Sequence, residues 1–292
     1  MRRKLFITGI IAAVLAVFLW LPLSNYPISL TVMKVYSGIH KSNSVMEQKG
    51  ISLEIPGGGI TQEKDWYPFV MTFNDSAGFR QFIREKAGKL NLGKKDSLEL
   101  TILYNFPAFD YSKGCSLLYN PQSPYYNSFY GAYLVSGRTA EGLPYGFTAD
   151  GSLDLESASQ VPQFDFQRLV LADLGIRASQ QVFDWKIESV SQNVDYVGSS
   201  GWTRLDASLR VNGVIHRVEG FRRSYLQYGR CAYDPKDYGL EDFAPVHMKG
   251  RLYAKYFSEW DTSIFFYIMT GDEQVLERCD AEILSKSILV TE

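Results

Sequence analysis

An uninterrupted apolar run near the N-terminus constrains this 292-residue chain more than any other feature of its sequence. The run extends from Leu5 to Leu23 and contains no charged side chain. At about 1.5 Å per residue, a helix of this length approaches the ~30 Å thickness of the hydrocarbon core of a bilayer. Arg2, Arg3 and Lys4 precede the run, and positive flanks stay in the cytoplasm. The run therefore predicts a transmembrane anchor whose N-terminus is cytoplasmic and whose remaining chain is extracytoplasmic.

A cleaved signal peptide is the alternative interpretation of this run, and cleavage would make the protein a secreted one. Cleavage needs small residues at the processing site, whereas the run ends in Trp20-Leu21-Pro22-Leu23. Trp20 and Tyr26 are typical of the aromatic belt at a membrane interface. A buried core helix of this length would show a polar face, which the run lacks. We therefore favour an uncleaved, single-pass anchor in the cell membrane.

The charge of the exported part excludes one class of partner. The chain has 30 Lys and Arg against 32 Asp and Glu, and removing the three leading cations leaves 27 against 32, a net charge of about −5. A negative chain binds phosphate backbones poorly, so we expect no nucleic-acid partner. The composition is 46% hydrophobic and 14% aromatic, which favours a packed core over disorder.

Two hydrophobic periods predict an α+β fold, a mainly antiparallel sheet with a few packing helices, preceded by one N-terminal transmembrane helix. Alternation of apolar and polar residues predicts strands at 51–55, 69–73, 98–104, 130–135, 145–148, 183–187, 205–211 and 252–256. A continuous apolar run at 264–269 is typical of a strand covered on both faces. Apolar spacings of three and four predict helices at 79–90, 165–174 and 275–283.

Asn212-Gly213 predicts a two-residue hairpin turn between two strands. Both central residues of a type I′ turn need positive φ, which Asn and Gly tolerate. Val214, His216 and Val218 would then return on the apolar face of the hairpin. His216 is therefore predicted to be a structural residue, partly buried and hydrogen-bonded.

These elements predict five segments along the chain. They are a cytoplasmic tip at 1–4, the anchor or signal segment at 5–23, a stalk at 24–49, an N-terminal α+β subdomain at 50–178 and a C-terminal subdomain of antiparallel sheet plus helix at 179–292. The last boundary follows Gly175, which is expected to end a helix.

No sequence pattern predicts catalysis, a metal or a cofactor. The three histidines, His40, His216 and His247, stand outside any motif with a nucleophile. Pairs of acids that hydrolyse glycans are dispersed in sequence and have no local signature. A cell-envelope hydrolase acting on glycan or peptide therefore stays open as the alternative function.

The three cysteines are an odd number, which leaves at least one thiol unpaired within a monomer. Cys115, Cys231 and Cys279 allow one disulfide in an exported protein, and the sequence does not choose the pair. Cys279 lies on the apolar stripe of a predicted helix. We expect it to behave as a small buried hydrophobe.

The segment from Tyr104 to Tyr133 holds ten aromatic rings, interrupted by three prolines. Proline is excluded from central strands, so several rings are expected on loops. Tyrosine combines a rigid face with a hydroxyl, and it is enriched at interfaces. The predicted ligand-binding residues are Tyr119, Tyr125, Tyr126 and Tyr130. The alternative is that the rings fill a core beneath a long loop.

We interpret the chain as a membrane-anchored extracytoplasmic binding or interaction protein without catalytic activity. Its predicted partners are the lipid bilayer through residues 5–23 and a glycan, a peptide or a protein. The sequence does not identify the ligand.

Overall fold

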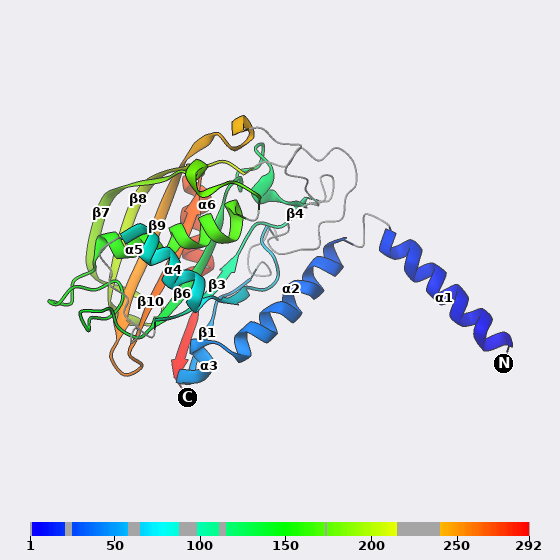
Figure 1. Ribbon diagram of the computed structural model, residues 1–292, viewed down its shortest axis with the longest axis horizontal. Helices are drawn as coiled ribbons and strands as arrows, with labels where there is room; N and C mark the ends of the chain where they lie inside the picture. Colours follow the sequence, from blue (N-terminus) through cyan, green and yellow to red (C-terminus); the bar gives the residue numbers. More distant parts are fainter. Residues whose placement is uncertain are drawn as a thin grey trace.

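A seven-stranded antiparallel sheet organises the protein (Figure 1). The computed structural model describes residues 2–20, 25–57, 65–87, 98–110, 115–172, 174–214 and 240–291. The strand order is β2-β3-β6-β10-β9-β8-β7. These strands are β2 (Met71–Asn74), β3 (Glu99–Asn105), β6 (Phe129–Ser136), β7 (Phe183–Tyr196), β8 (Ser199–Asn212), β9 (Pro245–Phe257) and β10 (Thr262–Thr270). The predicted mixed α+β fold with a mainly antiparallel sheet is confirmed.

Strand β10 lies at the centre of this sheet, and each of its nine residues is buried. Phe265 and Tyr267 point into the core on one face, whereas Phe266 and Ile268 point into the core on the other. A strand with two buried faces has no polar side to present, which explains its continuous apolar sequence. The prediction for 264–269 is confirmed.

Helices cover the Phe265 face of the sheet. They are α2 (Asn25–Ser42), α4 (Ser76–Ala87), α5 (Leu155–Phe164) and a π-helical segment (Asp165–Leu171) that continues α5. In α4, Phe79, Phe82 and Ile83 are buried, and the Asp75 carboxylate accepts a hydrogen bond from the Gly78 N–H at the helix start. The amphipathic helix predicted from this spacing is confirmed over the described residues.

The Phe266 face is covered by α3 (Val45–Lys49), α6 (Glu273–Glu282) and a two-stranded ribbon of β1 (Ile51–Glu54) and β11 (Ile288–Thr291). The predicted stripe of α6 is buried, including Cys279 as a free thiol. Asp272 caps this helix by accepting hydrogen bonds from the N–H groups of Gln274 and Val275. The shorter elements are β4 (Phe109–Asp110), β5 (Cys115–Ser116) and 3-10 turns at Leu117–Tyr119, Ala178–Gln180, Leu240–Phe243 and Leu284–Lys286.

Strands from both predicted subdomains share the sheet. β2, β3 and β6 come from 50–178, and β7 to β10 come from 179–292. Within the predicted stalk, α2 buries Met33 in the core. The division into domains stays a prediction.

The N-terminal helix α1 (Arg2–Trp20) stands clear of this body (Figure 1). Among the residues that the structure describes, no helix combines the length and the hydropathy that a membrane span needs. The transmembrane helix predicted from Leu5 to Leu23 therefore stays a prediction.

The hairpin prediction at Asn212-Gly213 is wrong. Neither residue has a positive φ, and Asn212 pairs with Pro245 at the end of the β8–β9 ladder. The Asn212 amide is instead a bridge, since Nδ2 donates to the Phe243 carbonyl and Oδ1 accepts from the Val182 N–H. Positive φ occurs in the turn between β7 and β8, at Val197 and Gly198. His216 and Cys231 lie outside the described residues.

Two further predictions differ from the structure. Residues 145–148 are turns with a single bridge between Phe147 and Leu153 rather than a strand. The helix predicted at 165–174 begins earlier, at Leu155, because Asp154 caps it by accepting from the Glu156 N–H.

Candidate functional site

The four tyrosines predicted to bind a ligand do not form one surface. Tyr119 packs in the core on the Phe265 face of the sheet, whereas Tyr125 and Tyr130 pack in the core on the Phe266 face. These three are buried and Tyr126 is half-buried. The alternative that the rings fill the core applies to the three buried tyrosines. A ligand-binding role for any of the four stays a prediction.

Two proline turns explain why the ring of Tyr125 points inward. Pro121 and Pro124 are exposed, and they lie in successive turns closed by hydrogen bonds from Ser123 N–H to the Asn120 carbonyl and from Tyr126 N–H to the Ser123 carbonyl. The prolines take the solvent side of the turns, which leaves the core side to this ring.

The hydroxyls of Tyr125 and Tyr130 have polar partners. The Tyr125 hydroxyl donates to the Asp65 carboxylate. The Tyr130 hydroxyl donates to the Pro56 carbonyl at 2.9 Å and accepts from Asn105 Nδ2 at 2.7 Å. These bonds offset the cost of desolvating a hydroxyl, so the two side chains serve the fold as tyrosines rather than as phenylalanines.

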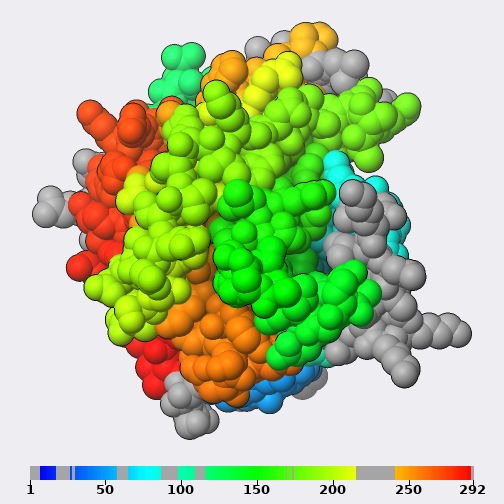
Figure 2. Space-filling model, turned by 90° about the vertical axis from the view of Figure 1, so that its left-hand side faces the viewer, coloured from blue at the N-terminus to red at the C-terminus, as the bar shows by residue number. Residues whose placement is uncertain are grey.

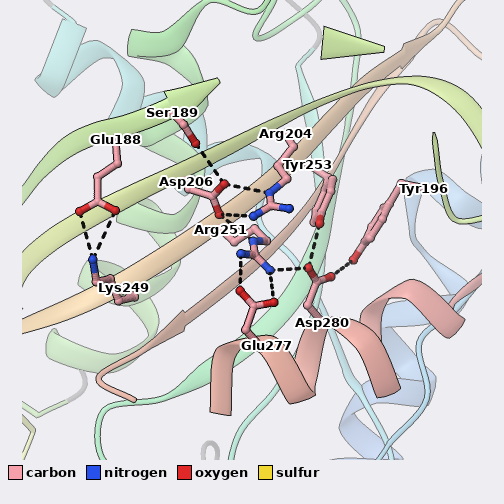
Figure 3. A network of polar contacts seen from close by, with 10 residues as sticks. All are labelled: Glu188, Ser189, Tyr196, Arg204, Asp206, Lys249, Arg251, Tyr253, Glu277 and Asp280. Atoms are coloured by element: carbon pink, nitrogen blue, oxygen red, sulfur yellow. Dashed lines mark hydrogen bonds and ion pairs between the residues drawn. The ribbon is translucent and has the colours of Figure 1, made fainter. Parts of the chain in front are cut away.

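A buried arginine on β9 forms ion pairs with three carboxylates between the sheet and α6 (Figure 3). Arg251 Nε lies 2.7 Å from Asp206 on β8, the strand position directly opposite. Its two terminal nitrogens lie 2.7 Å from Glu277 and 2.8 Å from Asp280. The two acids are three residues apart on α6, which places both carboxylates on the same side of the helix.

The arginine network extends through two tyrosines (Figure 3). Tyr196 and Tyr253 each donate a hydroxyl hydrogen bond of 2.8 Å to Asp280, and their rings stack at 3.6 Å. Burial alone would raise the pKa of Asp206, but hydrogen bonds from Arg204 and Arg251 outweigh it and lower that pKa. Arg251 thus donates its hydrogen bonds to carboxylates of the protein itself. The network links α6 to the sheet through Glu277 and Asp280.

A second buried acid lies on the opposite face of the sheet. Asp165 begins the π-helical segment, and its carboxylate accepts a hydrogen bond from the Tyr267 hydroxyl. Burial raises the pKa of Asp165 to about 7, although the hydrogen bond from Tyr267 acts in the opposite direction. Gly131 leaves room for this contact, since a Cβ there would lie 2.8 Å from the Tyr267 hydroxyl oxygen. An acid with such a pKa, on a π-helical segment, is a candidate proton donor.

An apolar cavity of about 40 Å³ lies between α5 and the sheet. It is on the side of the molecule seen in Figure 2, where the β7–β8 hairpin and the α5 segment lie side by side. Ala158 and Pro162 of α5, Trp185, Leu209 and Leu252 of the sheet, and Tyr267 are among its lining residues. No carboxylate is among the described residues that line this cavity. It therefore lacks the pair of acids that glycan hydrolysis requires.

A surface groove of about 450 Å³ runs between α2 and the β1 and β2 strands. Lys34 and Lys41, seven residues apart, lie on the same side of α2 and line one wall. The apolar lining comes from Leu53, Ile55, Phe69, Val70 and Leu103. Its volume and its apolar lining with a few polar groups are typical of small-molecule sites. Glu54 also lines the groove, so its charged groups are two ammonium groups and one carboxylate.

Gly57 is one of the residues that line the groove. A Cβ at this position would lie 2.6 Å from the carbonyl carbon of Pro68, so only glycine permits the two segments to approach so closely. The first glycine of the Pro56-Gly57-Gly58-Gly59 sequence therefore serves packing.

Sequence reasoning missed the groove, Arg251 and Asp165. Lys34 and Lys41 fall in the segment predicted as a stalk, although their spacing of seven was a readable sign of one helix side. Arg251 and Asp206 are 45 residues apart in the chain. Their contact depends on the β8–β9 register, which has no local signal.

No family model matches this chain, and no curated protein or solved structure shows significant similarity to it. Within the described part of the chain, no group of three His, Cys, Asp or Glu side chains is arranged to hold a metal ion.

Proposed function

We propose that this protein is a membrane-anchored extracytoplasmic binding or interaction protein without catalytic activity, held on the bilayer by α1. The observation that carries the proposal is the exposure of apolar side chains along this helix. Six of these side chains are 49–61% exposed, namely those of Ile7, Ile10, Ile11, Val14, Leu15 and Val17. Leaving such area in water costs about 25 cal/mol per Å², a cost that insertion into hydrocarbon removes.

The flanks of α1 support an orientation. Arg2, Arg3 and Lys4 favour a cytoplasmic N-terminus, and the apolar sequence continues to Leu23. The body would then stand on the extracytoplasmic side of the cell membrane. Secretion after signal cleavage is the alternative.

The groove beside α2 supports a binding role. Its two lysines outnumber the one carboxylate of the lining, Glu54, and the first contacts of an anionic ligand would be with the ammonium groups. A glycan, a peptide or a protein segment that carries a carboxylate or a phosphate has this chemistry.

A cell-envelope hydrolase is the second candidate function, and Asp165 is the observation that favours it. Its pKa of about 7 suits a general acid. The cavity beside α5 supplies no second carboxylate among its described lining residues, and so we place binding first.

Alkaline carbonate extraction of membranes from cells that express the full chain tests the anchor. We expect the protein to stay in the membrane pellet, and Ile11→Lys with Leu15→Lys to move it to the soluble fraction. Val190→Lys is the matched control, because Val190 is an exposed valine on β7, and this variant should stay in the pellet. Extraction of the unaltered chain by carbonate would refute the proposal.

A further inference from the structure

Helix α2 has two unlike sides. One side faces the body, where Met33 is buried, Ser37 Oγ accepts from the Thr72 N–H at 2.9 Å, and the His40 carbonyl accepts from Asn74 Nδ2. The hydrogen bond from Thr72 occupies part of the free edge of β2. This side of α2 therefore belongs to the fold and fixes the rotation of the helix.

The opposite side carries an apolar stripe that consists of Val32, Val35 and Ile39. These side chains are 39%, 59% and 59% exposed. Their spacings of three and four place them in one row along the helix. Figure 1 shows α2 at the margin of the body, and the exposure of the three side chains places the row on the solvent side of the helix. Within the described part of the chain, the fold leaves these three apolar side chains exposed.

The short connection to α1 limits where the stripe lies. α1 ends at Trp20 and α2 begins at Asn25, and five residue steps span at most about 18 Å. If α1 crosses the bilayer, the start of α2 is therefore close to the membrane surface. The 18 residues of α2 make a helix about 27 Å long, which brings the whole stripe near the lipid only when the helix lies flat.

The charge of α2 fits the same surface. The helix contains Lys34, His40 and Lys41 and no acidic residue, and both lysines are exposed. Lysine side chains extend from interfacial helices toward anionic headgroups. A helix with one apolar row, exposed lysines and no acid has the composition of an interfacial helix.

We propose that α2 lies flat on the extracytoplasmic surface of the bilayer, with Val32, Val35 and Ile39 inserted at the boundary between headgroups and acyl chains. This inference rests on the proposed function, because α1 must first hold the chain on the membrane. The lipid surface then fixes the orientation of the body. The edge of the sheet at β2 lies next to the membrane, β7 at the other edge lies away from it, and the groove with Lys34 and Lys41 opens beside the headgroups.

Site-specific photocrosslinking of the full chain tests this arrangement. A benzophenone amino acid at position 35 is incorporated into the protein, which is reconstituted in nanodiscs of phosphatidylcholine and phosphatidylglycerol and irradiated. The same probe at position 190 is the matched control, since Val190 is an exposed valine on the opposite edge of the sheet. We expect mass spectrometry to find a phospholipid adduct at position 35 and none at position 190. Ile39→Glu should reduce the adduct at position 35, because a carboxylate in the stripe opposes insertion.

Three outcomes overturn the inference in different ways. A cross-link at position 35 to a second copy of the chain would assign the stripe to a dimer. A chain that resists carbonate extraction but forms no lipid adduct at position 35 would leave the anchor intact and place the stripe in water. A chain that carbonate extracts from membranes would refute the anchor and the inference together.

Discussion

The guanidinium of Arg251 lies 2.8 Å from the carboxylate of Asp280, and the two side chains are 6% and 10% exposed. Arg251 comes from the middle of the sheet and Asp280 from α6, so this ion pair joins two layers of the fold. Neither charge has access to bulk water as a substitute partner. Its removal should therefore have a larger effect than the loss of a surface pair.

Arg251→Met should lower the free energy of unfolding by about 3–5 kcal/mol, because Asp280 would stay buried without its cation. Arg210→Met is the matched control, since Arg210 pairs with Asp184 at the surface, with exposures of 52% and 70%. That change should cost at most about 1 kcal/mol. Urea unfolding followed by tryptophan fluorescence measures both values. Equal losses for the two variants would show that the buried network contributes no more to stability than a surface ion pair.

Asp206 should make part of this stability sensitive to acid. Its pKa is lowered in the folded state, so the folded protein favours the carboxylate and binds this proton less readily than the unfolded chain does. The contribution is present above the ordinary pKa of about 4 and is lost as the pH falls through the lower folded value. The stability difference between the unaltered protein and Asp206→Asn should therefore shrink as the pH falls below about 4. A difference that does not change with pH would contradict this assignment.

Asp165 should have the opposite pH dependence. Burial raises its pKa from 3.8 to about 7, so the folded protein binds this proton more tightly than the unfolded chain does. Stability from this group is full at low pH and falls between about pH 4 and pH 7, by at most roughly 4 kcal/mol. Asp165→Asn keeps an oxygen that accepts from Tyr267 and removes the titration. The free energy of unfolding of this variant, relative to that of the unaltered protein, should rise between about pH 4 and pH 7. A difference that does not change with pH would show that Asp165 does not titrate in this range.

Tyr125 and Tyr126 are neighbours with different surroundings, and they distinguish packing from recognition. Tyr125→Ala should cost about 3–5 kcal/mol of stability because it empties a buried site. Tyr126 is half-buried, and Tyr126→Ala should cost about 1 kcal/mol, the centre of the range for point mutations. Thermal unfolding compares the two variants. A large loss for Tyr126 and a small loss for Tyr125 would contradict the packing described above.

The sequence predicted the elements whose pattern is local. The continuous apolar residues of β10, the apolar stripe of α6 and the alternation in β1 have their periods because each element buries one or two faces. By contrast, β7 and β8 each extend over 14 residues, well beyond the alternating segments at 183–187 and 205–211. Residues 188–193 of β7 are exposed, and the two strands continue there through pairing with each other, which needs no apolar face.

The candidate sites were less predictable because they depend on contacts between distant segments. Lys34 and Lys41 line a groove only because α2 packs along β2, and Asp165 meets Tyr267 across 102 residues of chain. The proline turns at Pro121 and Pro124 were readable as turns. Which side of each turn would face the core was not readable, and so the burial of Tyr125 could not be predicted.

Protease accessibility combined with mass spectrometry of the N-terminus tests the central claim, a membrane anchor with an extracytoplasmic body, most directly. Protease added to the extracytoplasmic side of intact membranes should digest the chain beyond Tyr26, and the mature protein should keep its first residues. Protection of the body from protease would contradict export, and a mature N-terminus near Asn25 would contradict the anchor.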